Sequence, residues 1–199
     1  MELYIGKSVY EPDGYKKKIS FKSFEVWTKF LSNEREHYYD AILDDVLYVV
    51  FGDLYKIGGC DNPAEICARA YMGGGLDEVF DVDGDFIFIR IVAEDEITVL
   101  QSNYGGPNFY YKLSGTDMAF STNASLLMDD FSEIDVDDRS VCDYLLYGSM
   151  IGGNTFSKRV KALLRGQSLS VKNGNIEVKN QRVIRRAASS TSRATTCGM

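Results

Sequence analysis

Cysteine and histidine often carry covalent and acid–base chemistry in proteins, and this chain has few of either. It has four cysteines, Cys60, Cys67, Cys142 and Cys197, and one histidine, His37. No CxxC pair occurs among the cysteines, so a structural metal site is not predicted. His37 lies in a polar stretch and is predicted to be a solvated surface side chain rather than a catalytic base. Cys67 and Cys142 fall on apolar faces of predicted helices and are expected to be reduced core residues.

The length and composition favour one domain with a core of its own. The chain has 199 residues, of which 45% are hydrophobic. Its formal charge of -7 argues against non-specific binding to nucleic acid, because phosphates are neutralised by Lys and Arg. The longest apolar run, 42–51, contains Asp44 and Asp45 and is too short to span a bilayer, and the first residues do not begin a signal peptide. A cytoplasmic protein that binds neither nucleic acid nor membrane is therefore expected.

The stretch from Val79 to Leu113 predicts three successive strands at the centre of a sheet. Its first strand alternates aromatic residues, Phe86 and Phe88, with isoleucines, a pattern expected when both faces of a strand are covered. Tight connections at 94–96 and 105–107 lead to the next strands, 97–100 and 109–113. Further strands are predicted at 3–9, 46–51 and 119–122 and in a hairpin around Asn173-Gly174.

Helices are predicted where apolar residues recur at helical spacing or where capping residues occur. Phe24, Trp27 and Phe30 predict an amphipathic helix over 21–31 with Trp27 toward the core. A second helix is predicted to begin at Asn62-Pro63 and to end at the glycines 73–75.

A short helix over 123–128 and a longer one over 139–147 complete the prediction. The acidic run 129–138 is interpreted as a loop whose last acids cap the longer helix, since it lacks the glycine and closing glutamate of a calcium loop. Val141, Cys142, Tyr144 and Leu145 are expected to form the buried face of that helix, which ends at Gly148.

The order of these segments resembles the N-terminal, class II glutamine amidotransferase domain of asparagine synthetase-like proteins. The resemblance spans about 47–179 and rests on the order and spacing of several short motifs. They are FGDLYK at 51–56, GCD at 59–61 with Glu65, GDFIFI at 84–89, NYGGPNFYY at 103–111, FSTN at 120–123 through Leu127, DYLLYG at 143–148 to TF at 155–156, and RGQSL at 165–169. Gln101-Ser102-Asn103 stands where the family has an Arg-Asp pair.

The resemblance implies a fold and a division of the chain. The fold is α+β, an N-terminal-nucleophile hydrolase-like αββα sandwich of two mostly antiparallel sheets between helices. The domain would cover 1–181, and the Ser/Thr/Arg-rich tail 182–199 would be disordered or bound to a partner.

The residues that carry the family's chemistry are replaced here. In the family an N-terminal cysteine attacks glutamine and the Asn and Gly of an N-G pair stabilise the oxyanion. Here Glu2 follows Met1, and Phe51 takes the place of the asparagine, which leaves the backbone of Gly52. Asp53 and Asp61 correspond to acids of the glutamine pocket and would be remnants. The family's arginine-bearing strand before residue 47 has no counterpart, and no catalytic residue, metal or cofactor is expected.

Three hypotheses follow. The first is a non-catalytic amidotransferase-like domain, a pseudoenzyme with a structural, regulatory or partner-binding role, associated with itself or with a separate ATP-dependent, asparagine synthetase-like amide-forming enzyme. The alternative is a divergent glutaminase subunit that supplies ammonia to such a synthetase, for which Cys60 would have to be the nucleophile. In the third, the end of the tail, 195–199, is a substrate or docking peptide of a maturation enzyme.

Overall fold

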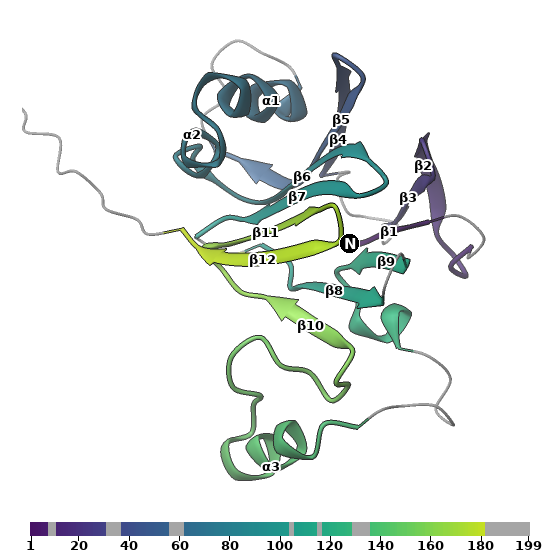
Figure 1. Cartoon of the computed structure of the whole chain (residues 1–199), viewed down its shortest axis with the longest axis vertical. Coiled ribbons are helices and arrows are strands. Elements are labelled where there is room, and N and C mark those ends of the chain that lie inside the picture. Colours follow the sequence, from purple (N-terminus) through teal and green to yellow (C-terminus); the bar gives the residue numbers. More distant parts are fainter. Residues whose placement is uncertain are drawn as a thin grey trace, which may run out of the picture.

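The computed structural model describes residues 1–7, 11–30, 37–55, 62–103, 106–114, 117–128 and 136–181. Two six-stranded antiparallel sheets are stacked face to face, as the resemblance implied (Figure 1). We call them the first and the second sheet. The first has the strand order β10 (Val160–Leu163), β8 (Phe109–Ser114), β9 (Asp117–Ser121), β1 (Glu2–Lys7), β3 (Phe24–Lys29) and β2 (Lys16–Phe21). The second has the order β12 (Asn175–Asn180), β11 (Gln167–Lys172), β7 (Glu96–Gln101), β6 (Gly84–Ala93), β5 (Val46–Leu54) and β4 (Tyr38–Leu43).

Strand β6 lies inside the second sheet and is covered on both faces, as its sequence predicted. Ile87, Ile89 and Ile91 pack into the core between the two sheets. Phe86 and Phe88 point the other way, into a cluster beneath the helices. The alternation of aromatic and aliphatic residues thus separates two cores, because successive side chains of a strand point to opposite faces.

The third strand of the stretch 79–113 was predicted in the wrong sheet. Strands β6 and β7 pair directly in the second sheet, whereas β8 pairs with β9 and β10 in the first. The apolar alternation of a strand shows that it is buried but not which neighbour it pairs with. Residues 102–108 therefore connect the two sheets rather than two neighbouring strands.

The helix predicted over 21–31 is wrong. Residues Phe24–Lys29 form β3, which pairs with β2 through a turn at Lys22-Ser23, where Lys22 has φ 53°. Phe24 and Val26 pack between the sheets, while Trp27 lies buried on the opposite face. The residues fit both spacings, and pairing with β1 and β2 decides in favour of the strand.

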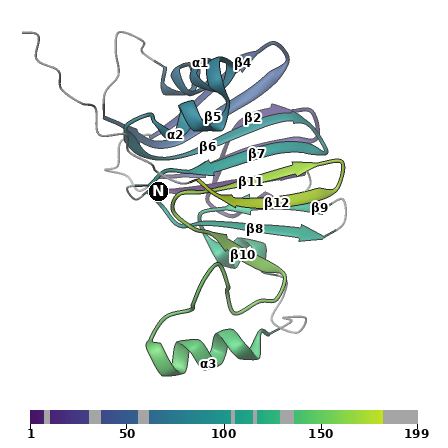
Figure 2. The same cartoon turned by 60° about the vertical axis from the view of Figure 1, so that its left-hand side comes forward.

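Two helices cover the outer face of the second sheet (Figure 2). Helix α1 (Pro63–Gly74) begins as predicted, because the Asn62 side chain accepts a hydrogen bond from the Ala64 N–H and Pro63 occupies the first turn. It ends at Gly75, and α2 (Leu76–Phe80) follows at once. The buried face of α1 consists mainly of Ala64, Cys67 and Ala68, with Ala70 and Tyr71 partly buried at its margin.

The outer face of the first sheet is covered differently. The 3₁₀ helix η1 (Ala124–Leu127), capped by Asn123, places Leu127 on Tyr4, Trp27 and Val160. Helix α3 (Asp138–Tyr147) lies apart from both sheets in Figures 1 and 2. None of the described helices is long and apolar enough to cross a membrane.

The buried face predicted for α3 is a further correction. Its caps are as expected, with Asp137 at the start and Gly148 in the left-handed conformation at the end. Yet Tyr144 and Leu145 are 48% and 77% exposed, Cys142 is also exposed, and Ser140 is the buried residue of the helix. Helical periodicity identifies an apolar face, but it does not show that this chain covers that face.

Candidate functional site: the end of strand β5

Gly52 lies near the end of β5 in a conformation that requires glycine. Its φ is +130°, and a Cβ atom built there would come within 2.2 Å of the Asp85 carbonyl oxygen on β6. Strands β5 and β6 pair with Gly52 opposite Phe86. The close approach of the β6 backbone therefore explains why the sequence has glycine at this position.

The backbone N–H of Gly52 is already hydrogen-bonded. It donates to the His37 carbonyl oxygen at 2.8 Å. Phe51, which stands where the resemblance places the oxyanion asparagine, is fully buried in the core between the sheets. Neither position therefore offers a free donor to a developing oxyanion, which needs donors aimed at the position where the negative charge forms.

The Asp53 carboxylate and the His37 imidazole contact each other, which was not predicted from the sequence. Their Oδ1 and Nδ1 atoms lie 2.5 Å apart, and the side chains are 55% and 27% exposed. The interpretation of His37 as a solvated surface residue is thus wrong in one respect: one ring nitrogen contacts the Asp53 carboxylate. The pair forms because β4 begins at Tyr38, opposite Phe51, so the residue before β4 reaches the end of β5.

A second carboxylate lies beside Asp53 on the neighbouring strand. Asp85 pairs with Asp53 in the register of β5 and β6, and its Oδ2 accepts a hydrogen bond from the Tyr55 hydroxyl at 2.5 Å. This hydrogen bond to a carboxylate raises the pKa of Tyr55. The other oxygen, Oδ1, is buried without a partner among the described residues. Asp53 and Asp85 lie far apart in the sequence and are brought together only by the register of β5 and β6, so their proximity could not be predicted.

Two of the residues singled out from the sequence, Cys60 and Asp61, lie outside the described residues. The cysteines that the structure describes are Cys67 and Cys142. Burial in α1 raises the pKa of Cys67 to about 12, so its thiol stays protonated and unreactive near neutral pH. Among the described residues, no group of three or more His, Cys, Asp or Glu side chains is placed to hold a metal ion.

The described part of this site therefore holds two engaged carboxylates, a paired histidine and a tyrosine, and its backbone donor is in use. These side chains can form hydrogen bonds with a polar group, but the Gly52 N–H is not free to stabilise an oxyanion.

Several solved structures resemble the chain, and two of them are described here. One is glutamine phosphoribosylpyrophosphate amidotransferase from B. subtilis complexed with ADP and GMP, with 9% identity, a TM-score of 0.45, and coverage of 92% of this chain and 43% of that one. The other, described as the allosteric regulatory enzyme of purine biosynthesis, has 10% identity, a TM-score of 0.45 and the same coverages, 92% and 43%. The chain thus spans less than half the length of either protein.

No match was found among curated proteins. A family model, by contrast, matches residues 59–182, which is more than half of the chain, and it describes a glutamine amidotransferase domain. The chain therefore belongs to the glutamine amidotransferase domain family.

Proposed function

We propose that this chain is a non-catalytic member of its family, which uses the amidotransferase scaffold to bind a protein partner in an amide-forming system. The hydrogen bond from the Gly52 N–H to the His37 carbonyl carries the proposal. A glutamine-hydrolysing site needs that donor for the oxyanion, and here it extends the pairing of β4 with β5.

The replacement of the oxyanion asparagine supports the same conclusion. Phe51 is 0% exposed and packs in the core between the sheets, so a polar side chain there would be buried among apolar neighbours. A buried amide without hydrogen-bond partners costs stability. A core phenylalanine where the resemblance places a hydrogen-bond donor thus supports a non-catalytic role.

The beginning of β1 is also engaged in structural contacts. The Glu2 carboxylate accepts hydrogen bonds from the Tyr15 hydroxyl and, at 3.2 Å, from the Asn123 amide. The hydrogen bond from Tyr15 is the main cause of its lowered pKa. The N–H of the next residue, Leu3, donates to the Thr122 hydroxyl at 2.8 Å. These contacts fasten β1 between β3 and β9.

Helix α3 supplies the surface for a partner. Leu145, Leu146 and Tyr147 are 77%, 74% and 66% exposed, and Ile151 beyond the helix is 53% exposed. Neighbouring exposed apolar residues on one element are typical of a protein-binding site. The partner that fits the family's chemistry is an ATP-dependent, asparagine synthetase-like enzyme that presents an apolar groove to this helix.

The first experiment tests catalysis. The purified chain is incubated with glutamine and released ammonia is measured, beside Cys60→Ala and Cys67→Ala variants. We expect no release above buffer for any of the three proteins. Release that persists in Cys67→Ala and disappears in Cys60→Ala would instead establish the glutaminase alternative.

The second experiment tests the partner surface. The chain is used to capture proteins from its native source, and the bound proteins are identified by mass spectrometry. We expect an ATP-dependent amide-forming synthetase that is lost with the double variant Leu145→Asp/Leu146→Asp. The matched control is Ile176→Asp on β12, an exposed apolar residue far along the chain from α3. Absence of a synthetase, or equal capture by the α3 variant, would refute this part of the proposal.

A further inference from the structure

A pocket of about 590 Å³ lies at the β10 edge of the first sheet and reaches Gln101 at the end of β7 in the second sheet. Its floor is formed by β8 and β10, where Tyr110 and Ala162 are opposite each other. The segment 150–156 and Met128, which follows η1, enclose it. A volume of this size is typical of sites for small organic ligands, which run from about 300 to 1,000 Å³. The pocket contains neither Gly52 nor Asp53.

The wall of the pocket is firmly built. Gly153 packs so closely on β10 that a Cβ atom there would lie 2.5 Å from the Ala162 carbonyl oxygen. The Ala162 N–H donates to the Gly153 carbonyl at 2.9 Å. The Thr155 hydroxyl donates to the Val160 carbonyl at 2.7 Å, and Asn154 bonds to Ile151 and Lys161. The pocket is thus preformed, and these polar side chains are already used to hold its wall.

The side-chain oxygen of Gln101 forms no hydrogen bond with the described residues. Gln101, at the end of β7, is 2% exposed and donates through Nε2 to the Pro107 carbonyl at 3.2 Å. Its Oε1 is buried without a hydrogen-bond partner among the described residues. A buried acceptor left unpaired costs about 1–3 kcal/mol, so a ligand that donates an N–H to it gains more than an exposed contact would.

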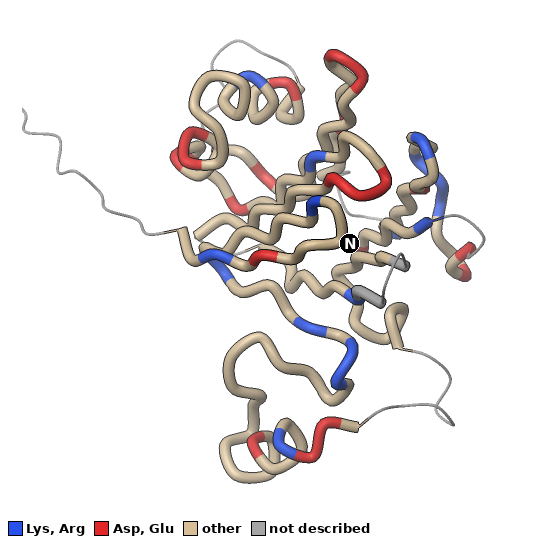
Figure 3. Tube along the Cα trace, in the orientation of Figure 1, with Lys and Arg blue, Asp and Glu red and all other residues tan. Residues whose placement is uncertain are grey.

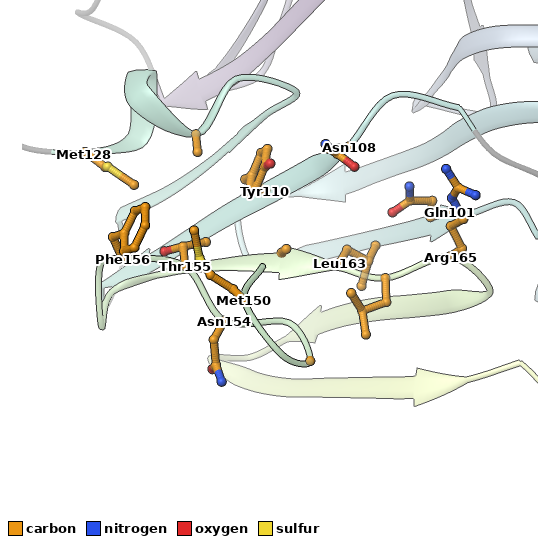
Figure 4. Close-up of a pocket in the computed structure, with 14 residues that line it drawn as sticks. Gln101, Asn108, Tyr110, Met128, Met150, Asn154, Thr155, Phe156, Leu163 and Arg165 are labelled. Atoms are coloured by element: carbon orange, nitrogen blue, oxygen red, sulfur yellow. The ribbon is translucent and has the colours of Figure 1, made fainter. Parts of the chain in front are cut away.

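A cation lies at the same end of the pocket. Arg165 lines it together with Gln101 and Asn108, and these three labelled side chains lie at one end in Figure 4. The Gly166 N–H donates to the Gln101 carbonyl at 3.1 Å, which ties the Arg165 segment to the end of β7. Arg165 is exposed and forms no ion pair with another described residue. Figure 3 shows further basic residues along β10.

The opposite end of the pocket is apolar. Met128, Met150 and Phe156 gather there, and Tyr110 and Leu163 lie between the two ends (Figure 4). The Phe156 ring packs in a T-shaped arrangement against the Tyr144 ring of α3, with a centroid distance of 5.4 Å. The two ends of the pocket are therefore complementary to a ligand that has an apolar body and a polar end. The polar end would carry both an N–H donor and a negative charge.

We propose that this pocket binds an apolar α-amino carboxylate, either a free amino acid or the C-terminal end of a peptide. The ligand's N–H donates to Gln101 Oε1, its carboxylate pairs with the Arg165 guanidinium, and its apolar side chains occupy the end lined by Met128 and Phe156. Arginine suits a carboxylate because its planar group can donate two parallel hydrogen bonds.

The test uses N-acetyl-leucyl-phenylalanine, the same dipeptide with a C-terminal amide, and free phenylalanine. Binding is measured by titration calorimetry and by fluorescence of Trp27, the single tryptophan, which is buried in the cluster that includes Tyr110 and Met128. We expect saturable binding of the dipeptide acid, about tenfold tighter than that of its amide, since an ionised partner strengthens a hydrogen bond. Free phenylalanine distinguishes the two sources: equal affinity indicates a free amino acid, and weaker binding indicates a peptide end.

Two variants test the two polar contacts. Arg165→Gln is expected to lower affinity for the acid about tenfold, to that of the amide, while Arg159→Gln, which does not line the pocket, leaves it unchanged. Gln101→Met removes the unpaired acceptor and is expected to weaken acid and amide alike. Because Gln101→Met also removes the Nε2 hydrogen bond to the Pro107 carbonyl, its thermal unfolding is measured as well, and a variant that stays folded at the assay temperature separates lost binding from lost folding. Equal binding of acid and amide, full affinity in Gln101→Met, or no saturable binding would overturn the proposal.

Discussion

Helices α1 and α3 are built from the same local signals and end in opposite environments. Each has a side-chain cap at its start, Asn62 or Asp137, and a glycine with positive φ at its end, Gly75 or Gly148. α1 buries Ala64, Cys67 and Ala68 on the second sheet, whereas α3 leaves most of its apolar residues exposed. The difference shows that capping determines where a helix forms, and that the surrounding chain determines whether its apolar face contributes to the core.

The comparison also separates two uses of apolar residues. Beneath α1, the Tyr71 ring stacks on Phe88 at 6.0 Å and the Arg90 guanidinium lies 4.9 Å from the Tyr71 centroid. On α3, the contact with the rest of the chain runs through Tyr144 and Phe156. Apolar residues beneath α1 are therefore packed within this domain, whereas most of those on α3 are exposed.

The largest expected effect concerns core truncation. Phe88→Ala removes a 0% exposed side chain beneath α1 and should lower the free energy of unfolding by about 3–5 kcal/mol. Leu146→Ala on α3, which is 74% exposed, should change it by less than about 0.5 kcal/mol. Urea unfolding of both variants measures the difference. A similar loss of unfolding free energy in both variants would show that α3 is packed against the rest of the chain. The contrast between α1 and α3 would then be wrong.

The next effect is a loss of stability at alkaline pH. Burial raises the pKa of Cys67 from 9.0 in the unfolded chain to about 12 in the fold. The unfolded thiol ionises first as pH rises, so stability from this group is complete below pH 9 and falls between pH 9 and about 12, by roughly 1.4 kcal/mol per pH unit.

Unfolding measured from pH 8 to pH 11 in a Cys67→Ala variant should lack this component of the decline. Cys142→Ala, the equivalent change on exposed α3, should keep it. Parallel curves for the unchanged protein and Cys67→Ala would show that the buried thiol does not contribute.

The glycines that end the two helices should differ in a measurable way. Gly75 has φ 77° and ψ -153°, a region restricted to glycine, so Gly75→Ala should cost about 1–3 kcal/mol of global stability. Gly148 has φ 71° and ψ 7°, which asparagine also adopts, so Gly148→Asn should be nearly neutral. Thermal unfolding of the two variants measures the difference. A large loss of stability in Gly148→Asn would contradict the left-handed conformation of Gly148 at the end of α3.

The smallest effect comes from the N-terminal caps. Asn62→Ala removes the acceptor of the Ala64 N–H and should lower global stability by about 1 kcal/mol. Asp137→Ala removes the acceptor of the Arg139 N–H and should raise the amide hydrogen exchange of α3 alone. Faster exchange throughout the sheets in Asp137→Ala would mean that α3 unfolds together with the sandwich.

Much of the fold could be predicted from the sequence because its signals are local. The both-sided burial of β6, the turn at Asn173-Gly174 and the caps at Asn62 and Asp137 each follow from adjacent residues. Predictions failed where the same residues fit both helical and strand spacing, as at 24–29. They also failed where the structure depends on contacts with residues far along the chain. The sheet to which β8 belongs and the exposure of α3 are of the second kind.

The features of the candidate site also fall into those that are local in the sequence and those that depend on distant contacts. By itself the sequence determined the order Phe51-Gly52-Asp53, which the resemblance sets against the family's N-G pair and the acid after it. The tertiary structure alone decided that the Gly52 N–H is occupied, that Asp53 is paired with His37, and that Gln101 and Arg165 share a pocket. Such contacts depend on strand register and on connections between sheets, and neither is encoded within one segment of the chain.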